Sequence, residues 1–122
     1  MEVSEMNLSD GEYTVEVTME GGSGRASIQS PTELTIENGQ AQAEIVWSSS
    51  HYDYMMVNGD KYLPVNTEGN STFEIPVSVF DEPMTVIGDT TAMSVPHEVE
   101  YTLTFASESV ASVQSSGGND MG

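Results

Sequence analysis

Hydrophobic and polar residues alternate along much of this chain, the pattern of strands with one face in a core and one face in water. The clearest example is residues 97–105, where glutamates and threonines occupy one face. The other face carries His97, Val99, Tyr101, Leu103 and Phe105. Towards its N-terminal end this apolar face changes to tyrosine and then to histidine, so it ends in side chains that can bind as well as pack.

Similar alternation, or a short apolar run, recurs at roughly ten-residue spacing, and Asn-Gly pairs mark two hairpins because both turn residues must accept a positive φ. The predicted strands are residues 13–19, 34–36, 41–47, 51–57, 61–63, 73–79, 84–87 and 97–105. We find no helical period over ten or more residues. The sequence therefore predicts an all-β fold, an antiparallel immunoglobulin-like β-sandwich of seven to eight strands. Trp47, the single tryptophan, is expected in its core.

The pattern also sets the expected domain limits. Residues 1–10 are polar and are predicted to be disordered. Residues 11–106 form the predicted sandwich domain. From residue 107 to residue 122 the apolar pattern fades into serine and glycine, the composition of a disordered tail or linker.

Charge limits the possible partners. Two basic residues face twenty acidic ones, giving a net charge of −18. Such a surface offers no basic footprint for nucleic acid, and it favours a soluble monomer. No apolar run is long enough to insert into a membrane. Cysteine is absent, which excludes disulfides, thiolate metal sites and thiol nucleophiles.

The sequence does not indicate an enzyme. It contains no nucleophile elbow, zinc-protease helix motif, P-loop or dinucleotide-binding fingerprint. The carboxylates alternate along strands as a solvated face would, and two histidines are few for a metal hydrolase. We therefore expect a binding module.

Histidine, tyrosine and methionine gather in residues 51–56 and 93–101, and all three can ligate haem iron. They also suit a bare transition metal, with methionine favouring Cu(I). Residues four apart on a flat strand lie about 13 Å apart. His97 and Tyr101 would therefore line one face of a wide planar ligand more easily than chelate one small ion. The bare-metal alternative uses His97, or His51 with Met55 or Met93.

The loop at residues 21–31 has two readings. It is a glycine-rich connection, or it is a lip over a ligand. In the second reading Ser23, Ser27 and Arg25 are offered to an acidic group of that ligand.

Four segments together resemble the NEAT (near-iron transporter) domain of bacterial haem-uptake proteins, over roughly residues 10–105. Residues 10–15, Asp-Gly-Glu-Tyr-Thr-Val, are similar to its opening D-G-x-Y-x-(I/V). Residues 34–39 resemble its second-strand turn, and residues 49–61 resemble its serine-led hairpin. Residues 97–105 resemble its closing Y-x-x-x-Y-(T)-(V)-x-F, with His97 in place of the first tyrosine.

The resemblance implies residue roles. In the family the first tyrosine of the closing motif ligates iron and the second hydrogen-bonds to it, while a serine after the first strand holds a haem propionate. Here His97 takes the ligand position and Tyr101 the supporting one, with Ser23 or Ser27 at the lip. Arg25 and Met93 complete the expected haem site.

Three functions follow as hypotheses. The first is a secreted or cell-surface bacterial module that captures haem, or a related iron ligand, and passes it to other relay proteins or an ABC importer. The second is an immunoglobulin-like adhesion or spacer module with no small ligand. The third is a module that binds copper or another transition metal.

Overall fold

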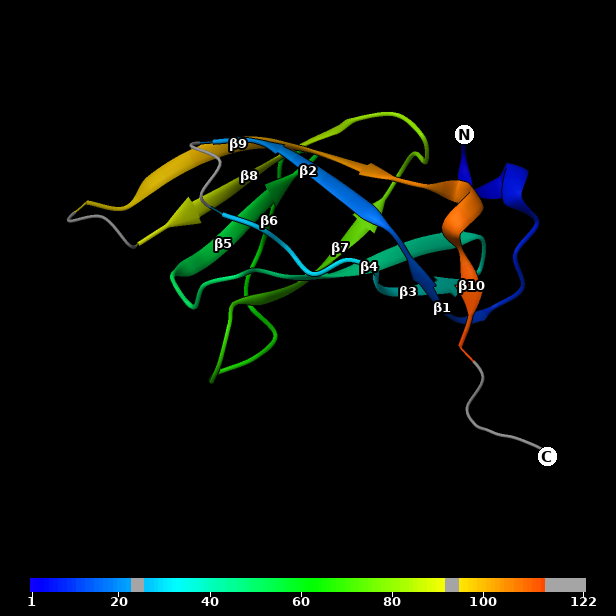
Figure 1. Cartoon of the computed structure of the whole chain (residues 1–122), viewed down its shortest axis with the longest axis horizontal. Helices are drawn as coiled ribbons and strands as arrows, with labels where there is room; N and C mark the ends of the chain where they lie inside the picture. The colour runs from blue at the N-terminus through cyan, green and yellow to red at the C-terminus, as the bar shows by residue number, and fades with distance from the viewer. Residues whose placement is uncertain (23–25, 92–94, 114–122) are drawn as a thin grey trace.

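The computed structural model describes residues 1–22, 26–91 and 95–113, and in them ten strands form two five-stranded antiparallel sheets packed as a sandwich (Figure 1). The first sheet has the order β10-β1-β3-β4-β7 and the second β2-β9-β8-β5-β6. The first sheet comprises β1 (Gly11–Val15), β3 (Thr32–Glu37), β4 (Gln40–Val46), β7 (Thr72–Val77) and β10 (Ala111–Ser112). The second comprises β2 (Val17–Gly21), β5 (Tyr52–Val57), β6 (Asp60–Tyr62), β8 (Met84–Thr90) and β9 (His97–Phe105).

The predicted fold class is confirmed, but the described strands outnumber the seven to eight expected. Residues 13–19 were predicted as one strand, and the structure divides them at Glu16 between the two sheets. Val15 pairs with Thr32 in the first sheet, whereas Val17 pairs with Phe105 in the second. Both valines are buried, so the alternation runs unbroken through the crossing and does not reveal it.

Both predicted Asn-Gly hairpins are confirmed. Asn38 and Gly39 have φ of 53° and 76°, and Asn58 and Gly59 have φ of 54° and 84°. Positive φ at both central residues is the requirement of the hairpin turns whose twist matches that of the flanking strands. These turns connect β3 to β4 and β5 to β6 and fix their registers.

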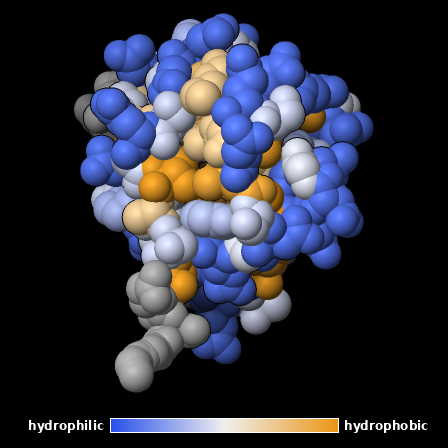
Figure 2. Space-filling model, turned by 90° about the vertical axis from the view of Figure 1, so that its right-hand side faces the viewer, coloured by the Kyte–Doolittle hydropathy of each residue, from blue (hydrophilic) through white to orange (hydrophobic). Residues whose placement is uncertain are grey.

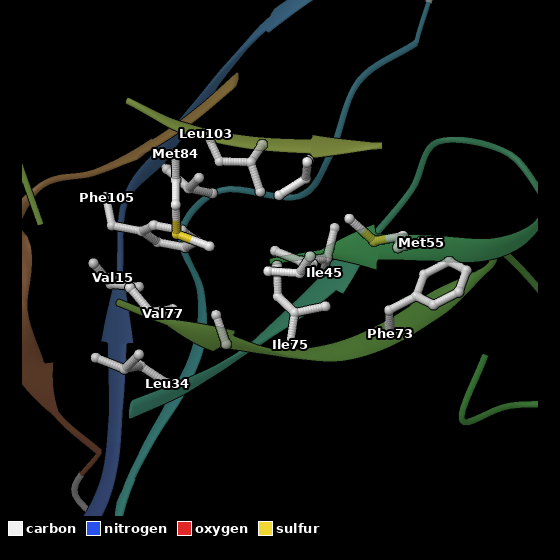
Figure 3. Close-up of a cluster of buried hydrophobic side chains, with 14 of the residues drawn as sticks. Val15, Leu34, Ile45, Met55, Phe73, Ile75, Val77, Met84, Leu103 and Phe105 are labelled. Carbon is white, nitrogen blue, oxygen red and sulfur yellow. The ribbon is translucent and has the colours of Figure 1, made fainter. Parts of the chain in front are cut away.

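The core lies between the inner faces of the two sheets, where side chains from both interdigitate (Figure 3). Leu34, Phe73 and Ile75 of the first sheet and Met55 and Leu103 of the second have no exposed surface. Trp47 is also buried, as its sequence context predicted. The core therefore occupies the inward positions of the period-two pattern.

Residues 1–10 differ from the expected disorder. Val3–Met6 form a short 3₁₀ helix, η1, and the Phe80 amide donates a 2.7 Å hydrogen bond to the Met1 carbonyl. Val3, Met6 and Leu8 pack against the core. Scattered apolar residues without a period supply this anchoring, so the alternation gives no sign of it.

The expected tail also begins later than residue 107. Ser107–Ser109 form a second 3₁₀ helix, η2, and β10 follows it beside β1. Asp81 fixes η2, because its carboxylate accepts hydrogen bonds from the Ser107 amide and hydroxyl at 2.8 and 2.5 Å. Residues 114–122 lie outside the described ranges.

Figure 2 shows the end of the molecule that bears η1, where hydrophilic side chains surround recessed apolar ones. A shallow hollow of about 410 Å³ lies between η1, the β3–β4 turn and the end of β7. It is at the opposite end of the sandwich from the β8–β9 hairpin that was predicted to bind a ligand (Figure 1). In the described ranges no helix has the length and apolar character needed to cross a bilayer.

Candidate functional site

His97 begins β9, directly after Pro96, and strand pairing aligns it with two other side chains. Its Cα is opposite that of Thr90 in β8, and Thr90 is opposite Tyr52 in β5. Residues directly opposite each other in antiparallel strands point to the same face. Because Tyr52 is buried on the inner face, His97 also belongs to that face, at the open end of the sandwich.

Three aromatic rings gather on the inner face near this end. Tyr52 stacks on Trp47 with ring centroids 3.9 Å apart and an interplanar angle of 17°. Tyr101 meets Trp47 edge-on at 5.2 Å. The hydroxyls of Tyr52 and Tyr101 are 3.1 Å apart and hydrogen-bonded. We call these three residues the aromatic base.

The aromatic base changes the role expected of Tyr101. Its side chain is 4% exposed, and its hydroxyl is bonded to Tyr52. Burial raises the pKa of Tyr52 far above its ordinary value, and the hydrogen bond with Tyr101 raises it further. The two hydroxyls satisfy each other, and the structure assigns Tyr101 a partner on β5.

Tyr52 was among the possible iron ligands of residues 51–56, but it was given no place in the expected haem site. Nothing in the sequence placed it in line with His97, with Thr90 of β8 between the two. That placement depends on a β-bulge between Tyr52 and Tyr54, which shifts the register of β5 against β8. Asn-Gly turns report a register only for the strands that they join.

The lip begins in close contact with the aromatic base, and glycine is required there. At Gly21, with φ of +117°, an added Cβ would lie 2.6 Å from the Glu100 carbonyl oxygen. At Gly22, with φ of +65°, it would lie 2.9 Å from Cε1 of Tyr101. The predicted glycine-rich lip therefore starts against Tyr101.

Of the lip residues, Ser27 is described and exposed, whereas Ser23 and Arg25 lie outside the described ranges. The Ser27 amide donates to the Ser48 hydroxyl at 3.1 Å, and the Ser48 amide donates to the Ser27 carbonyl at 2.8 Å. Ile28 then pairs with Trp47. Backbone pairing thus holds residues 27 and 28, in the second half of the lip, beside Trp47 of the aromatic base.

The His97 imidazole is exposed and, within the described part of the chain, accepts or donates no hydrogen bond. Val95, two residues earlier, is 70% exposed, and Val99 is half-buried beside the core. Glu98 faces the other side of the sheet, where its carboxylate accepts a short hydrogen bond from the Tyr54 hydroxyl. The ring is thus exposed, with a valine two residues away on each side in the sequence, and its charge acts on Asp89 of the neighbouring strand β8.

The charges nearest this hairpin are negative and lie on the outer face. Burial and a hydrogen bond with Asp53 raise the pKa of Asp89, which is 4% exposed. The hydrogen bond to Glu98 raises the pKa of Tyr54 to about 12. Lys61, one of the two cations of the chain, lies 4.4 Å from the centre of the Tyr54 ring. Lys61 is thus placed against Tyr54 on the outer face.

The bare-metal alternative gains no support from the described residues. Met55 has no exposed surface and belongs to the core, while His51 is exposed just before β5. Met93 lies outside the described ranges. In those ranges no group of three or more histidine, cysteine or acidic side chains could hold a metal ion.

A planar iron porphyrin fits the described residues better. The available donor is one imidazole, which haem iron accepts as a single axial ligand. Glycines allow the lip backbone to approach the aromatic base closely. The Trp47 indole nitrogen Nε1 is buried and has no hydrogen-bond partner among the described residues.

Comparison with known proteins was made at three levels. No family model matches the sequence, and no curated protein does. Among solved structures, the NEAT5 domain of IsdX2, a B. anthracis hemophore in complex with haem, is similar with a TM-score of 0.65 at 14% identity. A mutant of that domain in complex with haem gives a TM-score of 0.65 at 15% identity. Each comparison covers 80% of this chain and 96% of the other, so the likeness shows that this chain has the fold of these NEAT domains.

Proposed function

We propose that this chain is a bacterial binding module, secreted or on the cell surface, that captures haem. The observation that carries the proposal is the exposed His97 imidazole at the end of the inner face of β9, the strand that also carries Tyr101 of the aromatic base. Haem in the two similar solved structures supports the choice of ligand.

In this proposal His97 is the axial ligand of the iron. Val95 and Val99 supply apolar contact to the porphyrin, and the aromatic base excludes water beneath it. Ser27, Ser23 and Arg25 are proposed to receive the propionates, where a cation would offset part of the repulsion from a chain of net charge −18. The role is capture and transfer without catalysis, with relay proteins or an ABC importer as acceptors.

The test is a haem titration followed by absorbance in the Soret region, with binding expected to shift the band. His97→Ala should abolish the shift. The matched control is His51→Ala, since His51 is the other histidine of the chain and is also exposed. A wild-type titration with no Soret change would end the haem proposal.

A spacer or adhesion module without a small ligand is the second candidate. It is favoured by the Tyr52–Tyr101 hydrogen bond, which satisfies both phenols without a ligand. A metal analysis of the purified protein, set beside the haem titration, separates haem capture, bare-metal binding and the spacer role. If the chain is a spacer, the metal analysis would find no bound metal and the haem titration would show no Soret shift.

A further inference from the structure

The donor groups around His97 limit the oxidation state of iron that the site can hold, and this inference rests on the haem-binding role proposed above. A phenolate oxygen carries a negative charge and favours ferric iron. A neutral imidazole nitrogen serves ferrous iron as well, as the proximal histidine of globins does. Which donors face the site therefore decides whether the cargo is held only when oxidised.

The two phenols of the aromatic base are not available as phenolates. The hydroxyls of Tyr52 and Tyr101 bond each other at 3.1 Å, and their side chains are 7% and 4% exposed. Ionising either one would place a charge in an apolar interior, where the cost of desolvation is high. Neither phenol can turn to the iron without breaking that bond.

A third phenol, that of Tyr54, and the carboxylate of Glu98 are also occupied. Tyr54 donates its hydroxyl to the carboxylate of Glu98, on the opposite face of the sheet from His97. The Tyr54 ring is further held by the Lys61 ammonium group 4.4 Å from its centre. In the described ranges, the imidazole is the donor that remains on the inner face at this end.

We infer that the site binds ferrous as well as ferric haem, held by the neutral imidazole of His97. The cargo class is thus an iron porphyrin in either oxidation state. Reduction of the iron while it is bound would not be a release signal for this chain.

The experiment compares retention of the two forms. Wild-type protein is loaded with ferric haem, and half is reduced with dithionite under anaerobic conditions. The rate of haem loss to excess apo-globin is followed by absorbance. We expect the two rates to agree within about threefold, and the reduced sample to show the spectrum of an imidazole-ligated ferrous haem.

The diagnostic variant is His97→Tyr, which offers a phenol where wild type offers an imidazole, with His51→Ala as control. The variant should keep ferric haem but lose it at least about tenfold faster after reduction, while the control behaves as wild type. Circular dichroism checks that the variant is folded. If the variant does not fold, the comparison of ferric and ferrous haem loss from wild type still decides the inference.

The outcomes separate the two proposals. Absence of a Soret shift with either form would remove the haem-binding role itself. A wild-type protein that binds ferric haem but releases it at least tenfold faster on reduction would overturn the present inference and leave haem capture standing. Equal retention of ferric and ferrous haem by wild type supports the haem-binding role and the present inference.

Discussion

The hydroxyls of Tyr52 and Tyr101 lie 3.1 Å apart at the end of the sandwich where His97 is exposed. They come from β5 and β9, which are not neighbours in the second sheet because β8 lies between them. The bond therefore links the two strands across the inner face. It holds the base of the candidate site in place independently of any ligand.

A double-mutant cycle measures that link. Tyr52→Phe and Tyr101→Phe should each lower the free energy of unfolding by about 1–2 kcal/mol, because each leaves a buried hydroxyl unpaired. The double mutant should cost about as much as one single mutant, since it removes both hydroxyls together. Urea unfolding gives all three values, and additive single effects would mean that the two hydroxyls act separately.

The start of the lip can be tested with a pair of glycines that differ in surroundings. Gly21→Ala should destabilise the fold by more than about 2 kcal/mol, because its Cβ would meet the backbone at Glu100 and Tyr101 as well as adopt a strained φ. Gly59→Ala also has a positive-φ penalty, and no atom of the described residues lies within 4 Å of its Cβ. It should cost about 1 kcal/mol. Equal losses in thermal or urea unfolding would contradict the close approach of the lip to β9.

The local signals of the sequence were sufficient for most of the fold. Alternation with Asn-Gly turns located β3, β4, β5 and β6, and the pattern of residues 97–105 located β9 with its apolar face. The features that the sequence pattern did not reveal depend on contacts between segments far apart in the chain. The crossing at Glu16 preserves the alternation, and η1 is held by residue 80.

Some placements at the candidate site were predictable from the sequence, but the assembly of its residues was not. The position of His97 at the exposed end of an inward face followed from period two. The bonding partner of Tyr101 depended on the register of β5 against β8 and β9, which a bulge sets. Among the other predicted site residues, Met55 is a core residue because period two places it on the inner face of β5.

Gly88 tests how tightly the aromatic base is packed. An added Cβ would lie 3.2 Å from two atoms of the Trp47 ring and 3.3 Å from Cδ2 of Tyr52. Gly88→Ala should therefore displace the stacked rings and cost about 1–3 kcal/mol, as overpacking does in a dense core. Because Trp47 is the single tryptophan, its emission reports the change directly. An unaltered emission spectrum with unaltered stability would show that this region has room to spare.

The raised pKa of Asp89 predicts how the free energy of unfolding depends on pH. Burial, then its hydrogen bond with Asp53 and the charges of Asp53 and Glu98, raise its pKa above the ordinary value of 3.8, against a smaller lowering by His97. The folded state then binds more protons than the unfolded state between 3.8 and the raised pKa, so the free energy of unfolding falls as pH rises through that window. The penalty is absent below the window and complete above it.

Asp89→Asn should therefore be more stable than wild type at neutral pH, since the amide can still donate to Asp53 and carries no charge to desolvate. Its free energy of unfolding should also vary less between pH 4 and 7, measured by urea titration at several pH values, than that of wild type. Asp81→Asn is the control. Hydrogen bonds from Ser107 lower the pKa of Asp81, so the stability it contributes is lost only as pH falls below its ordinary value of 3.8. A steeper pH dependence in Asp89→Asn than in wild type would contradict the assignment of Asp89 as a buried, proton-retaining carboxyl.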